Sequence, residues 1–179
     1  EEIRRNVGEE TVKEVRVVNN SPRDEKSMRK LGRTRYGTEV EVYAAFADSD
    51  LRITTSSITP CMLAGWSGGG KVVMPGVSSR KSIHQNHKLF VKNVRRMNRG
   101  AMFGLIEGNL VREDIDDYAS RVGVDLTVTV FQDPEERVMG LVVGGLGVHR
   151  DAVKLGMKLF GARGVGEVDA VLVSDGMYS

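Results

Sequence analysis

The stretch of residues 59–87 holds the single cysteine of this chain, Cys61, and two of its three histidines, His84 and His87. It also holds three consecutive glycines followed by Lys71. Because glycine has no side chain, backbone N–H groups there can approach an anion or a flat ligand closely. A lysine beside them can neutralise a phosphate or act as a nucleophilic amine. A flexible surface loop carrying an ordinary lysine is the competing interpretation, and no Walker A sequence is present.

The two histidines lie three residues apart on a predicted helix, so both can face one side. A zinc site needs three or four protein ligands, whereas the sequence adds only Cys61 and His149, without an acidic partner at the usual spacing. A closed structural zinc site is therefore not expected. Two alternatives are left for these histidines. One of them can complete the coordination of a metal carried by a cofactor, or both can be structural residues of the helix. Cys61 would need a nearby base to act as a nucleophile, and a small buried residue is the alternative.

Local patterns predict the elements that position this stretch. A strand rich in β-branched residues over 51–59 leads into it, and a helix over 78–94, capped by Ser78 or Ser79, leaves it. Strands and helices intermix along the chain, which predicts one α/β domain over 1–179 with a mixed β-sheet flanked by helices. Ligands in such sheets tend to lie beyond the carboxyl ends of strands. The other predicted elements are a helix end over 1–8 closed by Gly8, a strand over 12–20, a strand turning into a short helix over 38–50, a helix over 111–123 ending at Gly123, an antiparallel hairpin of 124–132 with 137–145, a helix over 149–164 and a strand over 167–176.

Composition narrows the class of protein. The 179 residues are 40% hydrophobic and 28% charged, which is typical of one folded globular domain. A net charge of +2 argues against a nucleic-acid binder, and the basic run over 92–100 is explained by a solvated helix end. One cysteine excludes an internal disulfide and suggests a reducing cytoplasm. No apolar run approaches the length of a membrane span, so no membrane partner is expected.

The order of these residues resembles a motif of the nickel-dependent lactate racemases and related 2-hydroxy-acid racemases and epimerases. The family pattern is approximately P-H-x-x-A-G-[YFW]-S-G-G-x-K-x-x-x-P-G-[IV]-x-x-x-x-[ST]-I-x-x-N-H. The resemblance continues through "GNLVRED" at 108–114 and "VHRDAV" at 148–153. In this sequence the matching residues are Pro60, Cys61, Ala64, Gly65, Trp66, Ser67, Gly68, Gly69, Lys71, Pro75, Gly76, Val77, Ser82, Ile83, Asn86 and His87.

The resemblance implies a cofactor, the nickel-pincer nucleotide, which is a pyridinium bis-thiocarboxylate mononucleotide carrying nickel. Lys71 matches the lysine that tethers it covalently, and His87 matches the histidine that binds the nickel. The family reaction takes hydride from the hydroxyl-bearing carbon of a 2-hydroxy acid and returns it. The other residues that the resemblance places at the cofactor are Ser67, Gly68, Gly69, Pro75 and Gly76.

Two positions depart from the family pattern. Cys61 stands where the family has an acid/base histidine, and a thiol, with a reference pKa of about 8.5, is less suited to proton exchange at neutral pH than imidazole. Arg112 stands where the family motif usually has histidine. A catalytically degenerate or nucleotide-binding relative with the same fold is therefore the alternative function, and a metal-free phosphate-binding module is a weaker one.

The resemblance also implies that the chain is a fragment, from the central and C-terminal-domain part of a longer two-domain enzyme. A second catalytic histidine and the residues that hold the substrate carboxylate are then expected upstream, and further substrate contacts downstream. The remainder of its own chain is accordingly a required partner. We expect the isolated 179-residue piece to be inactive as a racemase.

Overall fold

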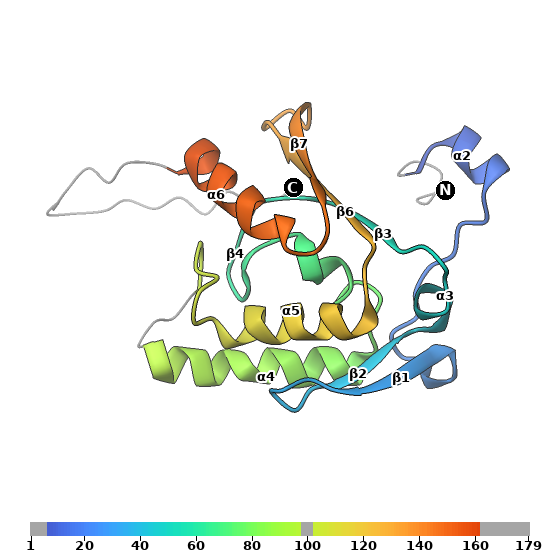
Figure 1. Ribbon diagram of the computed structural model, residues 1–179, viewed down its shortest axis with the longest axis horizontal. Coiled ribbons are helices and arrows are strands. Elements are labelled where there is room, and N and C mark those ends of the chain that lie inside the picture. Colours follow the sequence, from blue (N-terminus) through green and yellow to red (C-terminus); the bar gives the residue numbers. More distant parts are fainter. Residues whose placement is uncertain (1–6, 98–101, 162–179) are drawn as a thin grey trace, which may run out of the picture.

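The computed structural model describes residues 7–97 and 102–161. The predicted strand over 167–176 and the end of the helix predicted over 149–164 lie outside these residues. The architecture is α/β, with a mixed sheet and flanking helices (Figure 1). This confirms the predicted fold class.

The main sheet has three strands in the order β3-β6-β7. Strand β3 (Ile53–Ser57) runs parallel to β6 (Leu126–Gln132), which pairs antiparallel with β7 (Val138–Gly144). Every second residue of β6 is buried, as expected for a strand with one face on the core. The predicted strand over 51–59 and the predicted hairpin are therefore confirmed.

Helices α4 (Arg80–Met97) and α5 (Leu110–Val122) lie side by side beneath this sheet (Figure 1). Ser79 accepts a hydrogen bond on Oγ from the N–H of Ser82 at 3.1 Å, the N-cap contact expected at the start of α4. Helix α5 ends at Gly123, whose φ of 82° suits glycine. A third helix, α6 (Val148–Phe160), packs against β6 and β7.

The amino-terminal third differs from the prediction. The strand predicted over 12–20 is wrong, because helix α2 (Glu9–Glu14) covers its start and extended, mostly exposed chain follows. Its β-branched residues have no partner strand, and β-propensity without pairing does not make a sheet. Gly8 follows the helical residue Val7 and precedes α2 as its N-cap, so it separates two helical segments, and the rest of the helix end predicted over 1–8 lies outside the described residues.

A strand that the sequence analysis missed lies just downstream. Strand β1 (Met28–Arg33) pairs antiparallel with β2 (Glu39–Tyr43), and the short helix α3 (Ala44–Ala47) follows β2. A 3₁₀ turn, η1 (Glu25–Ser27), precedes β1. Because β1 is exposed along nearly its whole length, it shows no alternation that would mark it as a strand.

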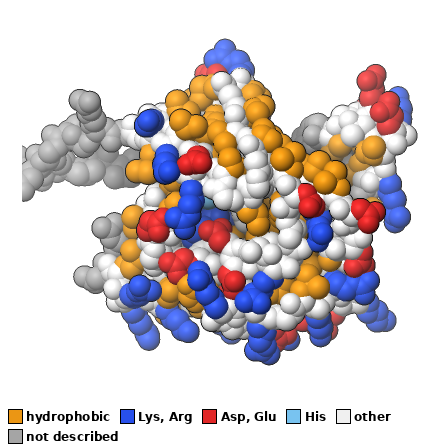
Figure 2. Space-filling model, in the orientation of Figure 1, with side chains coloured by type: hydrophobic (Ala, Val, Ile, Leu, Met, Phe, Trp, Pro, Cys, Tyr) orange, Lys and Arg blue, Asp and Glu red, His pale blue; other side chains and the backbone are white. Residues whose placement is uncertain are grey.

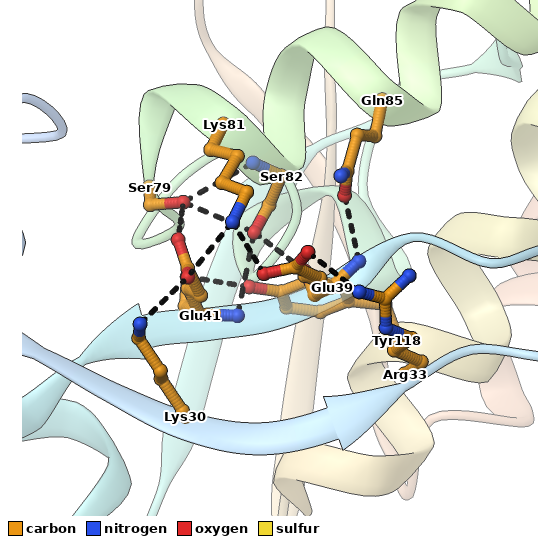
Figure 3. Close-up of polar contacts among 9 residues, drawn as sticks. All are labelled: Lys30, Arg33, Glu39, Glu41, Ser79, Lys81, Ser82, Gln85 and Tyr118. Carbon is orange, nitrogen blue, oxygen red and sulfur yellow. Dashed lines mark hydrogen bonds and ion pairs between the residues drawn. The ribbon is translucent and has the colours of Figure 1, made fainter.

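A set of polar side chains, some buried and some exposed, joins the start of α4 to β2 (Figure 3), and we call it the anchor network. Glu41, on β2, accepts a hydrogen bond from Ser79 Oγ at 2.8 Å, and the Tyr118 hydroxyl donates to the Glu41 carbonyl at 2.7 Å. Lys81 forms an ion pair with Glu39 at 2.6 Å. The network therefore fixes the first turn of α4 against the hairpin. Its members are Lys30, Arg33, Glu39, Glu41, Ser79, Lys81, Ser82, Gln85 and Tyr118.

The surface is divided by side-chain type. Figure 2 shows charged side chains gathered over α4 and α5, and hydrophobic ones over the hairpin of β6 and β7. Four large hydrophobic side chains of β7 are exposed: Val138, Met139, Leu141 and Val143. Among the residues described, no helix combines the length and apolar character that crossing a membrane requires.

Candidate functional site

The glycine loop, residues 60–76, begins just beyond the carboxyl end of β3 and lies between the sheet and the α4–α5 pair (Figure 1). Its first part folds back on itself, because β4 (Pro60–Cys61) pairs with β5 (Gly65–Trp66). A 3₁₀ turn, η2 (Gly69–Val72), follows and packs against α5. The fold-back brings Cys61 and Lys71, ten residues apart, to the same place.

Cys61 and Lys71 are in direct contact. The Lys71 Nζ lies 3.1 Å from the Cys61 Sγ, and both side chains are half-buried. Burial acts to raise the pKa of the Cys61 thiol, but the backbone N–H groups of Ala64 and Leu63 and the charge of Lys71 outweigh it, so this pKa is lowered. The thiol is therefore a better proton donor and nucleophile than an ordinary cysteine.

His87 lies on the second turn of α4. Burial lowers the pKa of its imidazole most, and the charges of Lys71 and His84 lower it further. The influence of Lys71 on His87 means that the two side chains act within electrostatic reach of one another. A lowered pKa keeps the ring neutral at neutral pH, which is the form that binds a metal.

The glycines of the loop are packed against the protein. A side chain at Gly69, which has a φ of 57°, would begin 2.6 Å from the ring of His149. One at Gly70 would begin 3.0 Å from Ile115, and one at Gly68 would begin 2.9 Å from Ser56 Oγ. Close packing against β3 at Gly68, against α6 at Gly69 and against α5 at Gly70 therefore accounts for glycine at these positions. Whether Gly68 and Gly69 also contact a cofactor stays a prediction.

Ser67 is held by the end of β3. Its Oγ donates to the Ser57 carbonyl at 3.0 Å and accepts from the Thr59 N–H at 2.7 Å. The Ser67 N–H donates to the Thr59 carbonyl at 2.8 Å. The hydroxyl therefore fixes the exit of the loop from the sheet, and its predicted contact with a cofactor remains untested.

Pro75 and Gly76 complete the loop. The Met74–Pro75 peptide bond is cis. A side chain at Gly76 would begin 2.0 Å from the Val72 carbonyl oxygen, so no other residue fits this backbone, and the Gly76 N–H donates to the Lys71 carbonyl at 3.3 Å. These two residues close the turn that carries Lys71, and their predicted contact with a cofactor likewise stays a prediction.

Arg112, on α5, holds the glycine loop, a role that the departure from the family motif at this position did not indicate. Its side chain is buried, 1% exposed, and its guanidinium donates to the carbonyls of Ala64 at 3.2 Å, Gly68 at 3.4 Å and Trp66. One cation therefore satisfies three loop carbonyls with its planar donors. An available signal was its position three residues before Ile115 on the apolar face of α5, where a charged residue needs internal partners.

His149, at the start of α6, also holds the loop. Its Nε2 lies 2.8 Å from the Ser67 carbonyl, which makes that nitrogen the donor. Burial, and next to it the charge of Arg112, lowers the pKa of His149 to about 4. The imidazole is thus a neutral structural side chain, and it does not join His84 and His87.

Three asparagines support the same region from beneath. Asn109 caps α5 and also donates to the Leu63 carbonyl at 3.0 Å, while Asn93 donates to the Asn109 side chain at 2.7 Å. Asn86, one residue before His87, donates to Asp114 at 2.8 Å. These buried bonds connect α4 and α5 and fix the turn of α4 that carries His87.

A cavity of about 500 Å³ lies at the start of α4, next to the anchor network and apart from the predicted site residues. His84 is part of its lining, so the two histidines of the stretch have different surroundings. Across residues 7–97 and 102–161, no three His, Cys, Asp or Glu side chains gather to form a metal site. A metal at His87 would need donors from outside that set.

The chain is similar to lactate racemases over most of its length. The sequence profile of the lactate racemase N-terminal domain matches residues 1–98, whereas the resemblance had pointed to a central or C-terminal portion. The chain is similar to a lactate racemase of Lactiplantibacillus plantarum, with 28% identity over 148 residues, which is 82% of this chain and 34% of that protein. It is similar to a lactate racemase of Thermoanaerobacterium thermosaccharolyticum, with 26% identity over 145 residues, 80% of this chain and 33% of that protein.

Solved structures agree in fold. The lactate racemase apoprotein of Thermoanaerobacterium thermosaccharolyticum superposes with a TM-score of 0.79 at 25% identity, over 86% of this chain and 36% of that chain. A protein of Thermotoga maritima gives a TM-score of 0.60 at 17% identity, over 79% and 38% of the two chains, and shows the fold alone. The chain spans about a third of the length of the curated relatives that it matches. Because the profile match extends over more than half of its residues, this chain belongs to the lactate racemase N-terminal domain family.

Proposed function

We propose that this chain is part of a racemase or epimerase of a 2-hydroxy acid that works with a nickel-pincer nucleotide. The observation that carries the proposal is the juxtaposition of three groups. The Lys71 amine lies 3.1 Å from Cys61 Sγ, and its charge lowers the pKa of His87. An amine, a thiol and a neutral imidazole thus share one region, at the positions where the family motif has its tether, its acid/base residue and its metal ligand.

The chemistry of these donors suits the cofactor. The Lys71 amine would hold it covalently, and the neutral His87 imidazole would bind the nickel. A single imidazole suffices only where the metal arrives with its other donors, which is consistent with the lack of a three-residue metal cluster in the described part of the chain. When bound, the group supplies a hydride acceptor for the hydroxyl-bearing carbon of the substrate.

Cys61 is the residue of this chain that we assign to proton exchange. In the cofactor-free chain the backbone N–H groups of Ala64 and Leu63 and the Lys71 charge stabilise its thiolate against the cost of burial, and the N–H groups would remain once the amine is used by the tether. A thiolate at this position can take the proton of the substrate hydroxyl and return it as the thiol. The β4–β5 pairing fixes the backbone of Cys61.

The supporting residues hold these three groups in fixed positions. Arg112 and His149 hold the loop through the carbonyls of residues 64–68, and the asparagines hold α4. None of these side chains needs to touch the substrate. They make the site rigid, which proton exchange at a defined atom requires.

A catalytically degenerate relative is the second candidate, and the observation that favours it is the sulfur at position 61. The Cys61 thiol contacts the Lys71 amine, and the imidazole of this region, His87, is assigned to the metal and not to proton exchange. In such a protein Lys71 and His87 would still bind the nucleotide, while proton exchange would be absent.

Assay of the full-length protein with cofactor supplied, against a panel of 2-hydroxy acids, separates the two. Activity on at least one acid, lost in Cys61→Ala and retained in Cys61→His, supports the racemase. If wild type is inactive on every acid while Cys61→His is active, the degenerate relative is correct. We expect the 179-residue piece alone to be inactive, because the chain spans about a third of its relatives.

A further inference from the structure

The contact between Cys61 and Lys71 has chemistry of its own. Cys61 is the only cysteine in the sequence, so no second thiol of this chain can pair with it. The Lys71 Nζ lies 3.1 Å from its Sγ, a separation from which an amine can reach an oxidised sulfur with little movement. The two side chains are half-buried, so a small oxidant can enter while large thiols meet steric hindrance.

The surroundings of the sulfur favour its oxidation. The Ala64 and Leu63 N–H groups and the Lys71 charge lower the pKa of the thiol despite its burial. Reaction with peroxide proceeds through the thiolate, and susceptibility follows thiolate character and access. Both conditions hold at Cys61.

We propose that peroxide oxidation joins Cys61 and Lys71 covalently, through a bond between Sγ and Nζ. The linkage is a sulfenamide, formed between side chains that the β4–β5 pairing and the turn η2 already hold together. It is a modification site distinct from any disulfide, and it forms within one chain.

The reaction balances with one molecule of hydrogen peroxide as oxidant. The thiolate sulfur attacks a peroxide oxygen and the O–O bond breaks. The leaving hydroxide takes a proton from the Lys71 ammonium, so the products are a sulfenic acid, water and a neutral Lys71 amine. The neutral Lys71 amine then attacks the sulfenic sulfur, the S–O bond breaks, an S–N bond forms, and a second water leaves. In total the sulfur loses two electrons to the peroxide, and the two side chains together lose two hydrogen atoms.

The position of the loop explains why the amine captures the intermediate. Arg112 and His149 hold the backbone of residues 64–68, so the turn carrying Lys71 cannot drift away from the sulfur. The neighbouring amine is present at high effective concentration, whereas further peroxide must diffuse in. Capture therefore competes well with oxidation to sulfinic acid.

The consequence for the protein rests on the proposed function. Lys71 is the proposed tether for the cofactor, and an amine bound to sulfur cannot form that tether. Oxidation would thus block loading of the cofactor-free protein, and a thiol reductant would restore both the thiol and the amine. The linkage itself requires only the contact and does not depend on that function.

The test uses the cofactor-free full-length protein treated with hydrogen peroxide, followed by peptide mass mapping. We expect a linked peptide containing Cys61 and Lys71, lighter by two hydrogen atoms than the sum of its parts, which disappears on reduction. Cys61→Ser and Lys71→Arg should abolish it completely, and the latter should accumulate sulfinic and sulfonic acid instead. Lys81→Arg, at an ion-paired lysine of the anchor network, should leave the linkage unchanged.

Each outcome decides the proposal. A linked peptide that retains one oxygen between sulfur and nitrogen would overturn the proposed sulfenamide, because its sulfur and nitrogen are not bonded to each other. Equal rates of sulfinic acid formation in wild type and Lys71→Arg, with no linked peptide in either and circular dichroism unchanged, would overturn it. If the linkage forms but later loading of the cofactor is unaffected, the Cys61–Lys71 linkage is supported and Lys71 is not the tether.

Discussion

Two polar clusters meet the same helix, α4, and use it differently. The anchor network at its first turn consists of hydrogen bonds and ion pairs that close on themselves, as Figure 3 shows for Glu41, Ser79 and Tyr118. The second cluster, Cys61, Lys71 and His87, meets α4 at its second turn. Its members are partly exposed, and Lys71 lowers the pKa of both other groups.

The difference separates polar groups that stabilise from polar groups that react. A buried hydroxyl or carboxylate with all its partners inside the protein contributes to folding and offers nothing to a ligand. A thiol and an imidazole whose pKa values are shifted by a nearby amine keep their proton chemistry available. Arg112 and His149 belong to the first kind, although they lie directly beneath the second cluster.

The largest effect on stability is expected for Arg112→Met. The change leaves the carbonyls of Ala64, Trp66 and Gly68 without their donor in a buried setting, which should cost about 3 kcal/mol or more of unfolding free energy. Urea denaturation measures it. Lys81→Met in the anchor network removes an exposed cation and should leave the urea midpoint nearly unchanged. Equal shifts in the two variants would contradict the role of buried Arg112 as the donor that holds the loop.

The next effect is a loss of stability in acid. Burial, aided by the charge of Arg112, lowers the pKa of His149 from 6.5 to about 4 in the folded chain. The unfolded chain therefore takes up a proton first, and stability falls as pH decreases from 6.5 towards 4, by about 3 kcal/mol in all. Denaturation curves across this range measure the slope. His149→Phe, which keeps a ring beside Gly69, should flatten the slope, and an unchanged slope would assign it to other groups.

A smaller effect is expected for Tyr118→Phe. The hydroxyl of this fully buried side chain donates to the Glu41 carbonyl at 2.7 Å, and its loss should cost about 1 kcal/mol. The rate of Cys61 alkylation should stay as in wild type, because the anchor network and the reactive cluster are separate. A changed alkylation rate with an intact fold would show that they are coupled.

The smallest free-energy change is expected for Lys71→Met. Removing the amine takes away one of the influences that lower the pKa of Cys61, so the thiolate fraction at neutral pH should fall. Alkylation by iodoacetamide should slow severalfold, with little change in the urea midpoint. Lys81→Met is the matched control and should alkylate at the wild-type rate.

Periodic elements could be predicted from the sequence, and irregular ones could not. The hairpin of β6 and β7 alternates clearly, and Gly123 marks the end of α5. Strand β1 has no buried face to create a pattern, so it was not predicted. The β-branched residues over 12–20 have no partner strand, so the strand predicted there does not form. Both errors come from tertiary pairing, which a single segment does not encode.

Some features of the candidate site could likewise be predicted from the sequence, and others could not. The motif identified Cys61, Lys71 and His87 as groups of one site, and the structure brings the first two into contact. The sequence could not indicate that Gly69 is required by the ring of His149, or that Arg112 holds three carbonyls of the loop. Those roles depend on residues more than forty positions apart, and they follow from packing.

The central claim is that Lys71 and His87 together hold one cofactor, and the intact mass of the full-length protein isolated with its cofactor tests it most directly. We predict a covalent adduct in wild type and in Lys81→Ala, no adduct in Lys71→Ala, and an adduct without nickel in His87→Ala. A wild-type protein supplied with cofactor that never gains mass, or an adduct that survives Lys71→Ala, would contradict the account.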